Sequence, residues 1–225
     1  MSLSIIVPVY NEEDCIEECI RQLCSVFPGD EFEVIIVNDG STDATAELLA
    51  KNKESYGFQL VSYPENKGYA SAIHEGIKVA KNEYFTIFDA DLQVKAKDIH
   101  RMYRTASENN LDLVVGEPES KGYHLLRSMV SRGYNMLVRI MFHIKVRDIN
   151  SPKIVRKSML SDVKLAYGHA MIDVEILAYA FAKKASHTGV SYTIQQRYKG
   201  ESKFNVMLIP RTLIDLIRLK IKIGV

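Results

Sequence analysis

The chain carries the stretch Phe85-Thr86-Ile87-Phe88-Asp89-Ala90-Asp91-Leu92-Gln93, in which an apolar run ends at two carboxylates. The apolar part predicts a buried strand, and in an extended segment residues i and i+2 point the same way. Asp89 and Asp91 can therefore aim at one point just past the end of that strand. In open α/β sheets, ligands bind at that edge.

Two converging carboxylates repel each other unless a cation or a proton lies between them. Oxygen ligands alone favour a hard divalent ion such as Mg²⁺ or Mn²⁺, and such an ion would most naturally hold the phosphates of a substrate. A purely structural alternative is that Asp89 ends the strand and Asp91 caps the helix that follows near Lys95.

Strands and helices alternate along the first half of the chain. The apolar periodicity predicts strands at residues 3–10, 33–37, 58–63, 84–88 and 111–115, and helices at 16–27, 44–51, 69–80 and 97–108. This alternation, with mostly apolar strands, predicts an α/β fold with a parallel sheet and helices on both faces.

Three polar turns follow predicted strands, and in a parallel sheet they would lie along one edge and form a crevice. They are Tyr10-Asn11-Glu12, Asn38-Asp39-Gly40 and Asp89-Ala90-Asp91. The alternative is that strand ends are polar simply because they meet water.

The second half of the chain is less regular. An amphipathic helix is predicted over 125–142, a short strand over 154–156, a helix over 172–183 and a strand over 190–198. On the first of these helices Arg132, Asn135 and Arg139 would share a face, either as a binding surface or as solvated charges. A final amphipathic segment over 210–222 has an apolar face of Leu213, Ile214, Ile217 and Ile221.

Composition is that of one α/β domain with extensions. The chain has 225 residues, 47% of them hydrophobic, and a formal net charge of +1, so no global field indicates a nucleic-acid partner. Its three cysteines, Cys15, Cys19 and Cys24, fit one helix and favour buried thiols in a reducing compartment. A redox or metal–sulfur cluster is the alternative. We expect neither a signal peptide nor a membrane-spanning segment.

Six motifs in sequence order resemble family 2 glycosyltransferases with the GT-A fold. They are Ile5–Glu12, Ile36–Asp43, Asn66–Gly68, Asp89–Gln93, Arg127–Asn135 and Arg197–Lys203. The last three are similar to those of dolichol-phosphate mannose synthases and related polyprenyl-phosphate glycosyltransferases. The resemblance implies a Rossmann-like, mostly parallel sheet in a single domain. Residues 1–116 would bind the nucleotide sugar, 117–204 the acceptor, and 205–225 would form an amphipathic C-terminal helical segment.

The resemblance also implies the donor site, for a GDP- or UDP-linked hexose. Its nucleoside pocket would be lined by Pro8, Tyr10, Glu12 and Asp39, with Asp39 accepting a hydrogen bond from the base. Lys67 and Ala90 would belong to the same donor site, and Arg197 and Lys203 would neutralise phosphate charge.

The metal, Mg²⁺ or Mn²⁺, would be held by the acidic motif. Asp89 would lie near the ribose and the metal, while Asp91 and Gln93 would ligate the ion that bridges the diphosphate. These roles are implied by the family resemblance.

The acceptor decides whether a base is needed. A polyprenyl phosphate is already an anion near neutral pH and needs only cations to hold it, for which Arg127 and Arg132 are the candidates. A saccharide hydroxyl needs a carboxylate base, for which Asp173 and Glu175 are the candidates, although Glu175 could equally be a charge on a helix surface. We therefore expect inverting hexosyl transfer, to either acceptor, from a cytoplasmic position on the membrane surface. A non-catalytic nucleotide-sugar binder is the alternative from another class.

The chain departs from that branch at three places. Asn38 stands where Asp is usual, and Gly116-Glu117-Pro118 stands where many relatives have Gly-Ser-Arg. Ser151 is followed by Pro152-Lys153 instead of the usual Gly-Phe. These departures concern the sugar and acceptor pockets more than the donor phosphate site.

Overall fold

The computed structural model describes residues 2–119 except 28 and 30, residues 125–196 except 162, 164, 167, 169 and 170, and residues 209–224. Within helices, it describes no side chains at 125–131 or 209–211. All statements below concern these parts of the chain.

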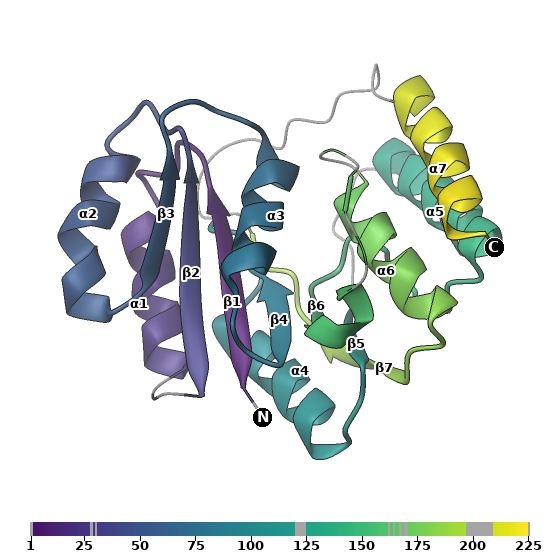
Figure 1. The fold of residues 1–225 in the computed structure, drawn as a ribbon, viewed down its shortest axis with the longest axis horizontal. Helices are drawn as coiled ribbons and strands as arrows, with labels where there is room; N and C mark the ends of the chain where they lie inside the picture. The colour runs from purple at the N-terminus through teal and green to yellow at the C-terminus, as the bar shows by residue number, and fades with distance from the viewer. Residues whose placement is uncertain are drawn as a thin grey trace.

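Seven strands form one sheet in the order β3-β2-β1-β4-β6-β5-β7 (Figure 1). Their bounds are β1 Leu3–Val9, β2 Phe32–Asp39, β3 Gln59–Tyr63, β4 Tyr84–Ile87, β5 Leu113–Pro118, β6 Lys153–Arg156 and β7 His187–Tyr192. Strand β6 runs antiparallel to its neighbours β4 and β5, and every other pair is parallel. The prediction of a mostly parallel sheet is confirmed.

Helices cover both faces of this sheet, as predicted. Their bounds are α1 Ile16–Val26, α2 Thr45–Tyr56, α3 Tyr69–Val79, α4 Ala96–Glu108, α5 Leu125–Phe142, α6 Ile172–Ala182 and α7 Ile209–Ile223, with a 3₁₀ helix at Lys157–Leu160. Side chains of α1, α2 and α4 form one core with one face of the sheet. Side chains of α3, α5, α6 and α7 pack on the other face.

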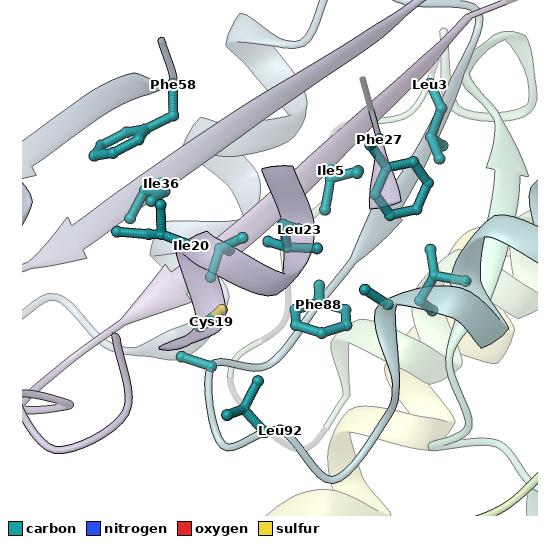
Figure 2. Close-up of a cluster of buried hydrophobic side chains, with 14 of the residues drawn as sticks. Leu3, Ile5, Cys19, Ile20, Leu23, Phe27, Ile36, Phe58, Phe88 and Leu92 are labelled. Atoms are coloured by element: carbon teal, nitrogen blue, oxygen red, sulfur yellow. The ribbon is translucent and has the colours of Figure 1, made fainter. Parts of the chain in front are cut away.

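Strand β1 is the centre of the first core. All seven of its residues are buried, because helices cover the sheet on both sides. Leu3 and Ile5 pack toward α1, while Ile6 packs with the opposite core. Figure 2 shows Phe88 and Leu92 in the same apolar cluster as Leu3 and Ile5. The residues on either side of the acidic pair are thus anchored in the core, which fixes where the pair lies.

Most predicted bounds differ from the structure by a few residues, and two elements differ most. Helix α2 continues to Tyr56 and ends at Gly57, which is in the left-handed region with φ +69°. Strand β7 begins at His187 and ends at Tyr192, because its register on β5 pairs Leu113 with His187 and Pro118 with Tyr192. Pairing with a distant strand, which local alternation does not reveal, sets the ends of β7.

The apolar face predicted for the C-terminal segment faces outward. Among the described side chains of α7, Leu216 and Leu219 are buried, whereas Leu213, Ile214, Ile217 and Ile221 are exposed. In the described residues, no helix is both long enough and apolar enough to cross a bilayer.

Candidate functional site

A cavity of about 130 Å³ lies at the end of β4. Its polar lining includes Asp89, Asp91, Gln93, Ser151, Lys153 and Asp173. These residues come from the turn after β4, from the segment leading into β6, and from the first turn of α6. The structure therefore brings the predicted acidic pair together with Gln93 and Asp173 around one cavity.

The two acids make different local contacts. The Tyr69 hydroxyl donates a hydrogen bond to Asp89 Oδ1 at 2.8 Å, which orients this carboxylate. Asp91 Oδ1 accepts a hydrogen bond from the backbone N–H of Gln93 at 3.0 Å. Helix α4 begins only at Ala96 and has no side-chain cap, so the alternative that Asp91 caps this helix is wrong.

The same turn contains a residue with a strained backbone. Leu92 has φ +59°, in the left-handed region that costs a residue with a Cβ roughly 1–2 kcal/mol. Its side chain is buried in the core below the turn. Core packing of Leu92 therefore compensates for the strain and holds Asp91 and Gln93 in place.

Burial and the neighbouring Asp91 carboxylate raise the pKa of Asp89 to about 6. Asp173 raises this pKa further, whereas the Tyr69 hydroxyl and the Lys153 ammonium oppose the rise. Asp89 is nevertheless exposed to solvent, and it lines the cavity. A carboxylate destabilised by a second one, and still accessible, is suited to binding a cation.

The donor set fits a metal that is completed by a ligand's own oxygens. Among the described residues, no group of three or more His, Cys, Asp or Glu side chains is placed to hold a metal ion. Mg²⁺ typically uses one or two protein carboxylates together with phosphate oxygens and water. Asp89, Asp91 and the Gln93 amide could hold such an ion.

Lys153 is a cavity residue to which the sequence pattern assigned no role. This residue of β6 is 3% exposed, lines the cavity, and donates a hydrogen bond from Nζ to Asp173 Oδ1 on α6. The departure from Gly-Phe after Ser151 was the one feature of the sequence that pointed to it. Asp173, a predicted candidate for a catalytic base, lines the cavity, but a buried ammonium already pairs with it.

The polar turns after β1 and β2 are linked to each other, as the predicted crevice requires. Asn11 has φ +54°, and its Oδ1 accepts a hydrogen bond from the Thr42 N–H at 2.8 Å. The Glu12 N–H donates to Thr45 Oγ1 at 2.9 Å. Tyr10 is 43% exposed beside these contacts, and Pro8 is buried in β1.

Asp39 organises the next loop. Its carboxylate accepts hydrogen bonds from the backbone N–H groups of Lys67 and Gly68, both at 2.8 Å. Gly40, at φ +68°, lets the backbone at Glu65 come close to the turn after β2, because a Cβ on residue 40 would lie 2.4 Å from the carbonyl carbon of Glu65. The Lys67 ammonium lies over the Tyr63 ring. That Asp39 accepts a hydrogen bond from a nucleotide base stays a prediction.

Several predicted residues do not reach this cavity. Glu175 is fully buried, accepts hydrogen bonds from the Ala166 N–H at 3.1 Å, and lies 3.6 Å from the Lys222 ammonium of α7. It is neither a surface charge nor a lining residue of the cavity, so it is not placed to act as a base. Arg132 is exposed on α5 and does not line the cavity either.

Asn135 does not share the exposed face of α5 with Arg132 and Arg139. It is buried, bonding to Asp148 and to the Ile149 N–H. The Arg127 side chain, Arg197 and Lys203 lie outside the described residues.

The cysteines are free thiols, as expected. Cys15 and Cys19 are buried and Cys24 is half-buried. Burial and the Glu12 carboxylate raise the pKa of Cys15 to about 12, and burial raises the pKa of Cys19 well above its usual value. Thiols that resist ionisation are poor nucleophiles and poor metal ligands, which argues against a redox or metal–sulfur role.

Comparison with known proteins gives one family. The sequence profile described as "Glycosyl transferase family 2" matches residues 4–165. The chain is 30% identical to the dolichol-phosphate mannosyltransferase of Pyrococcus furiosus, covering 97% of this chain and 64% of that protein. It is 29% identical to the dodecaprenyl-phosphate galacturonate synthase of Rhizobium johnstonii, covering 96% of this chain and 66% of that protein. The chain thus spans just under two thirds of the length of these relatives.

Solved structures share the fold. Glucosyl-3-phosphoglycerate synthase from Mycobacterium tuberculosis, in complex with Mn²⁺, UDP and glucosyl-3-phosphoglycerate, superposes with a TM-score of 0.74 at 17% identity, covering 97% of this chain and 79% of that one. Staphylococcus aureus TarS 1–349 in complex with UDP-GlcNAc gives 0.71 at 22% identity, covering 98% of this chain and 65% of that one. The expected GT-A fold is confirmed.

The raised pKa of Asp89 predicts how stability depends on pH. The folded protein binds this proton more tightly than the unfolded chain, so ionisation of Asp89 destabilises the fold as pH rises from about 4 to 6. In metal-free buffer, Asp89→Asn should therefore match wild type near pH 4 and exceed it at pH 7.5. Because solvent weakens the effect of the exposed Asp89 carboxylate, we expect Asp89→Asn to gain about 1 kcal/mol of stability at pH 7.5. This gain corresponds to about 2–4 °C in Tm.

Thermal unfolding with and without Mn²⁺ measures this effect. Mn²⁺ should raise the Tm of wild type at pH 7.5 and raise that of Asp89→Asn much less. Asp98→Asn is the matched control, because Asp98 lies on α4 and pairs with Arg101 at 3.0 Å. A metal-free Asp89→Asn protein less stable than wild type at pH 7.5 would contradict the assignment.

Proposed function

The chain belongs to glycosyl transferase family 2, and from that membership we propose that it transfers a hexose from a nucleotide-diphosphate sugar to a polyprenyl phosphate. The names of the two relatives given above each include a polyprenyl phosphate, dolichol phosphate in one and dodecaprenyl phosphate in the other. The observation that carries the choice of acceptor is the buried ion pair between Lys153 and Asp173 in the cavity.

The donor would lie along the edge of β1, β2 and β4. Asp39, Pro8, Tyr10 and Glu12 would hold the nucleoside, and Lys67 with Ala90 would complete that side of the site. Asp39 keeps further lone pairs beyond those used by the Lys67 and Gly68 N–H groups, so it can also accept a bond from the base. GDP- and UDP-linked hexoses both suit such an acceptor.

The diphosphate would meet the acidic turn. Asp89, Asp91 and Gln93 would hold Mg²⁺ or Mn²⁺, which when bound supplies charge neutralisation for the leaving diphosphate. Arg197 and Lys203 are proposed, from the family resemblance, to neutralise the same phosphates. One structural neighbour was solved with Mn²⁺ and UDP together.

Apart from the acidic pair, the described cavity residues offer no free carboxylate base for an acceptor hydroxyl. Asp173 is the only cavity carboxylate described there apart from the acidic pair, and Lys153 pairs with it. A carboxylate whose oxygen already accepts a hydrogen bond from a buried ammonium is not a free base. A phosphate monoester needs no such base, since its second pKa is about 6. It would attack the anomeric carbon opposite the leaving diphosphate and invert its configuration.

Two features of α5 and α7 suit a lipid acceptor. These helices pack side by side at the end of the molecule farthest from α2 (Figure 1). They expose Met136, Ile140, Ile217 and Ile221, the last 76% exposed. Arg132, Arg139, Arg218 and Lys220 lie on the same two helices. We propose that this α5–α7 surface contacts an anionic bilayer, with Arg127 and Arg132 gripping the acceptor phosphate.

A cytoplasmic location fits these proposals. Three free cysteines are typical of a reducing compartment. The protein would then be peripheral on the cytoplasmic face of a membrane.

Transfer to lipid is tested by where the label goes. With Mn²⁺, detergent and undecaprenyl phosphate, labelled sugar from UDP-glucose or GDP-mannose should move into the organic phase. Asp91→Asn should lower this rate at least 100-fold, because the metal that neutralises the diphosphate loses a carboxylate ligand. Arg127→Ala and Arg132→Ala should each lower it about tenfold, because the acceptor phosphate loses a charge-assisted hydrogen bond.

Arg104→Ala is the matched control for the arginine variants. Arg104 lies on α4 and pairs with Glu108 on its own helix. Unchanged lipid transfer in both arginine variants would make the acceptor assignment wrong. Label that stays in water with a saccharide acceptor would favour transfer to a hydroxyl. If Asp91→Asn complements the cellular function fully, a non-catalytic binder is favoured.

Contact with the bilayer is tested by sedimentation with vesicles of phosphatidylcholine containing roughly one third phosphatidylserine. Ile217→Ser/Ile221→Ser should weaken binding at least tenfold, because two large apolar side chains no longer enter the interface. Tyr56→Ser, at the end of α2, is the control, since Tyr56 is also exposed but lies away from the α5–α7 surface. Equal binding by all three proteins would exclude this surface.

A further inference from the structure

Ser151 is a buried hydroxyl that lacks a partner within the described structure. It is 1% exposed, it lines the cavity, and its Oγ makes no hydrogen bond there. A buried hydroxyl without a partner costs about 1–3 kcal/mol, and native proteins rarely leave one unpaired. Because the hydroxyl is part of the cavity wall, a ligand can supply the missing partner.

Lys153 lies two residues further along and lines the same cavity. It replaces the aromatic residue that is usual after Ser-Gly in the resembled branch, so it is a feature of this chain. A lysine that is 3% exposed needs a compensating charge, which Asp173 provides. Of the three hydrogens of the ammonium, this contact uses one.

The pair offers hydrogen-bond donors and acceptors at a fixed spacing. The Lys153 ammonium donates and the Asp173 carboxylate accepts, and Ser151 Oγ can do either. Each hydroxyl of a hexose also donates and accepts, so neighbouring sugar hydroxyls match such a pair. A nucleoside diphosphate offers no comparable group beyond its phosphates and ribose.

The place of this cluster relative to the acidic turn gives it a role. Asp89 and Asp91 lie on the β4 side of the cavity, where the diphosphate is proposed to bind. Ser151, Lys153 and Asp173 lie on the β6 and α6 side. Because the hexose is bonded directly to the diphosphate, it must bind immediately next to the acidic turn.

We propose that Ser151, Lys153 and Asp173 form the subsite that binds the hydroxyl groups of the transferred hexose, with Lys153 as its specificity-determining residue. This inference rests on the proposed function, because it names which part of the nucleotide sugar the cavity holds. The Lys153–Asp173 pair binds and orients the sugar and takes no proton from the acceptor. The subsite would therefore discriminate between nucleotide sugars, but not between bare nucleotides.

The test compares two affinities in each variant. Calorimetry with Mn²⁺ measures binding of UDP and UDP-glucose, and of GDP and GDP-mannose, to the whole chain. Ser151→Ala should leave the affinity for the bare nucleotide within twofold of wild type. Its affinity for the matching nucleotide sugar should fall about tenfold, the value of one hydrogen bond. Ser107→Ala is the control, since Ser107 bonds the Arg104 carbonyl on α4.

Ser151→Ala also separates a binding role from a structural one. Its Oγ makes no bond in the described structure, so the variant should be at least as stable as wild type without ligand. A marked loss of Tm would show that Ser151 serves folding, and would overturn its place in the subsite.

Lys153→Met alone leaves Asp173 buried without its partner and could unfold the protein. The double variant Lys153→Met/Asp173→Asn removes both charges and avoids that problem. It should lose the same sugar-dependent affinity while still binding the bare nucleotide. If both variants keep the wild-type ratio of nucleotide-sugar to nucleotide affinity, this inference fails and the proposed function stands. If wild type binds none of the four ligands, both fail.

Discussion

The structure depends on two like charges that the core holds together. Asp89 and Asp91 would separate if the turn between β4 and α4 were free to move, because their carboxylates repel. Phe88 and Leu92, on either side of the pair, are buried among side chains of β1 and α1 (Figure 2). Apolar burial thus maintains an electrostatic strain that a cation can relieve, and the left-handed backbone of Leu92 is part of the same arrangement.

The neighbouring loops extend this arrangement along the sheet edge. Asp39 fixes the loop before α3 through two backbone N–H groups, and Tyr69, at the start of α3, reaches the Asp89 carboxylate. Hydrogen bonds at both ends of the Lys67–Tyr69 segment therefore connect the end of β2 to the turn after β4. Nucleoside, diphosphate and sugar would be bound along one edge, each next to a different strand.

The first half of this structure could be predicted from sequence because its information is local. Apolar strands alternate with helices, and the spacing of Asp89 and Asp91 places both at one strand end. Periodicity also predicted the helices and the short strand β6 of the second half, but not its decisive contacts, because these join distant elements. Lys153 on β6 meets Asp173 on α6, and β7 takes its ends from its register with β5. Periodicity identified the apolar face of α7 but not that it faces outward, because helix packing determines that.

The central claim is that the Asp89–Asp91 turn binds a divalent ion together with the donor's diphosphate. Crystals grown with Mn²⁺ and either UDP or GDP would test it most directly, through anomalous scattering at the manganese edge. The account predicts one strong peak between the two carboxylates, within about 2.0–2.4 Å of oxygens from the protein and from the diphosphate. Ordered nucleotide with no peak at this turn, or with the two acids pointing apart, would contradict it.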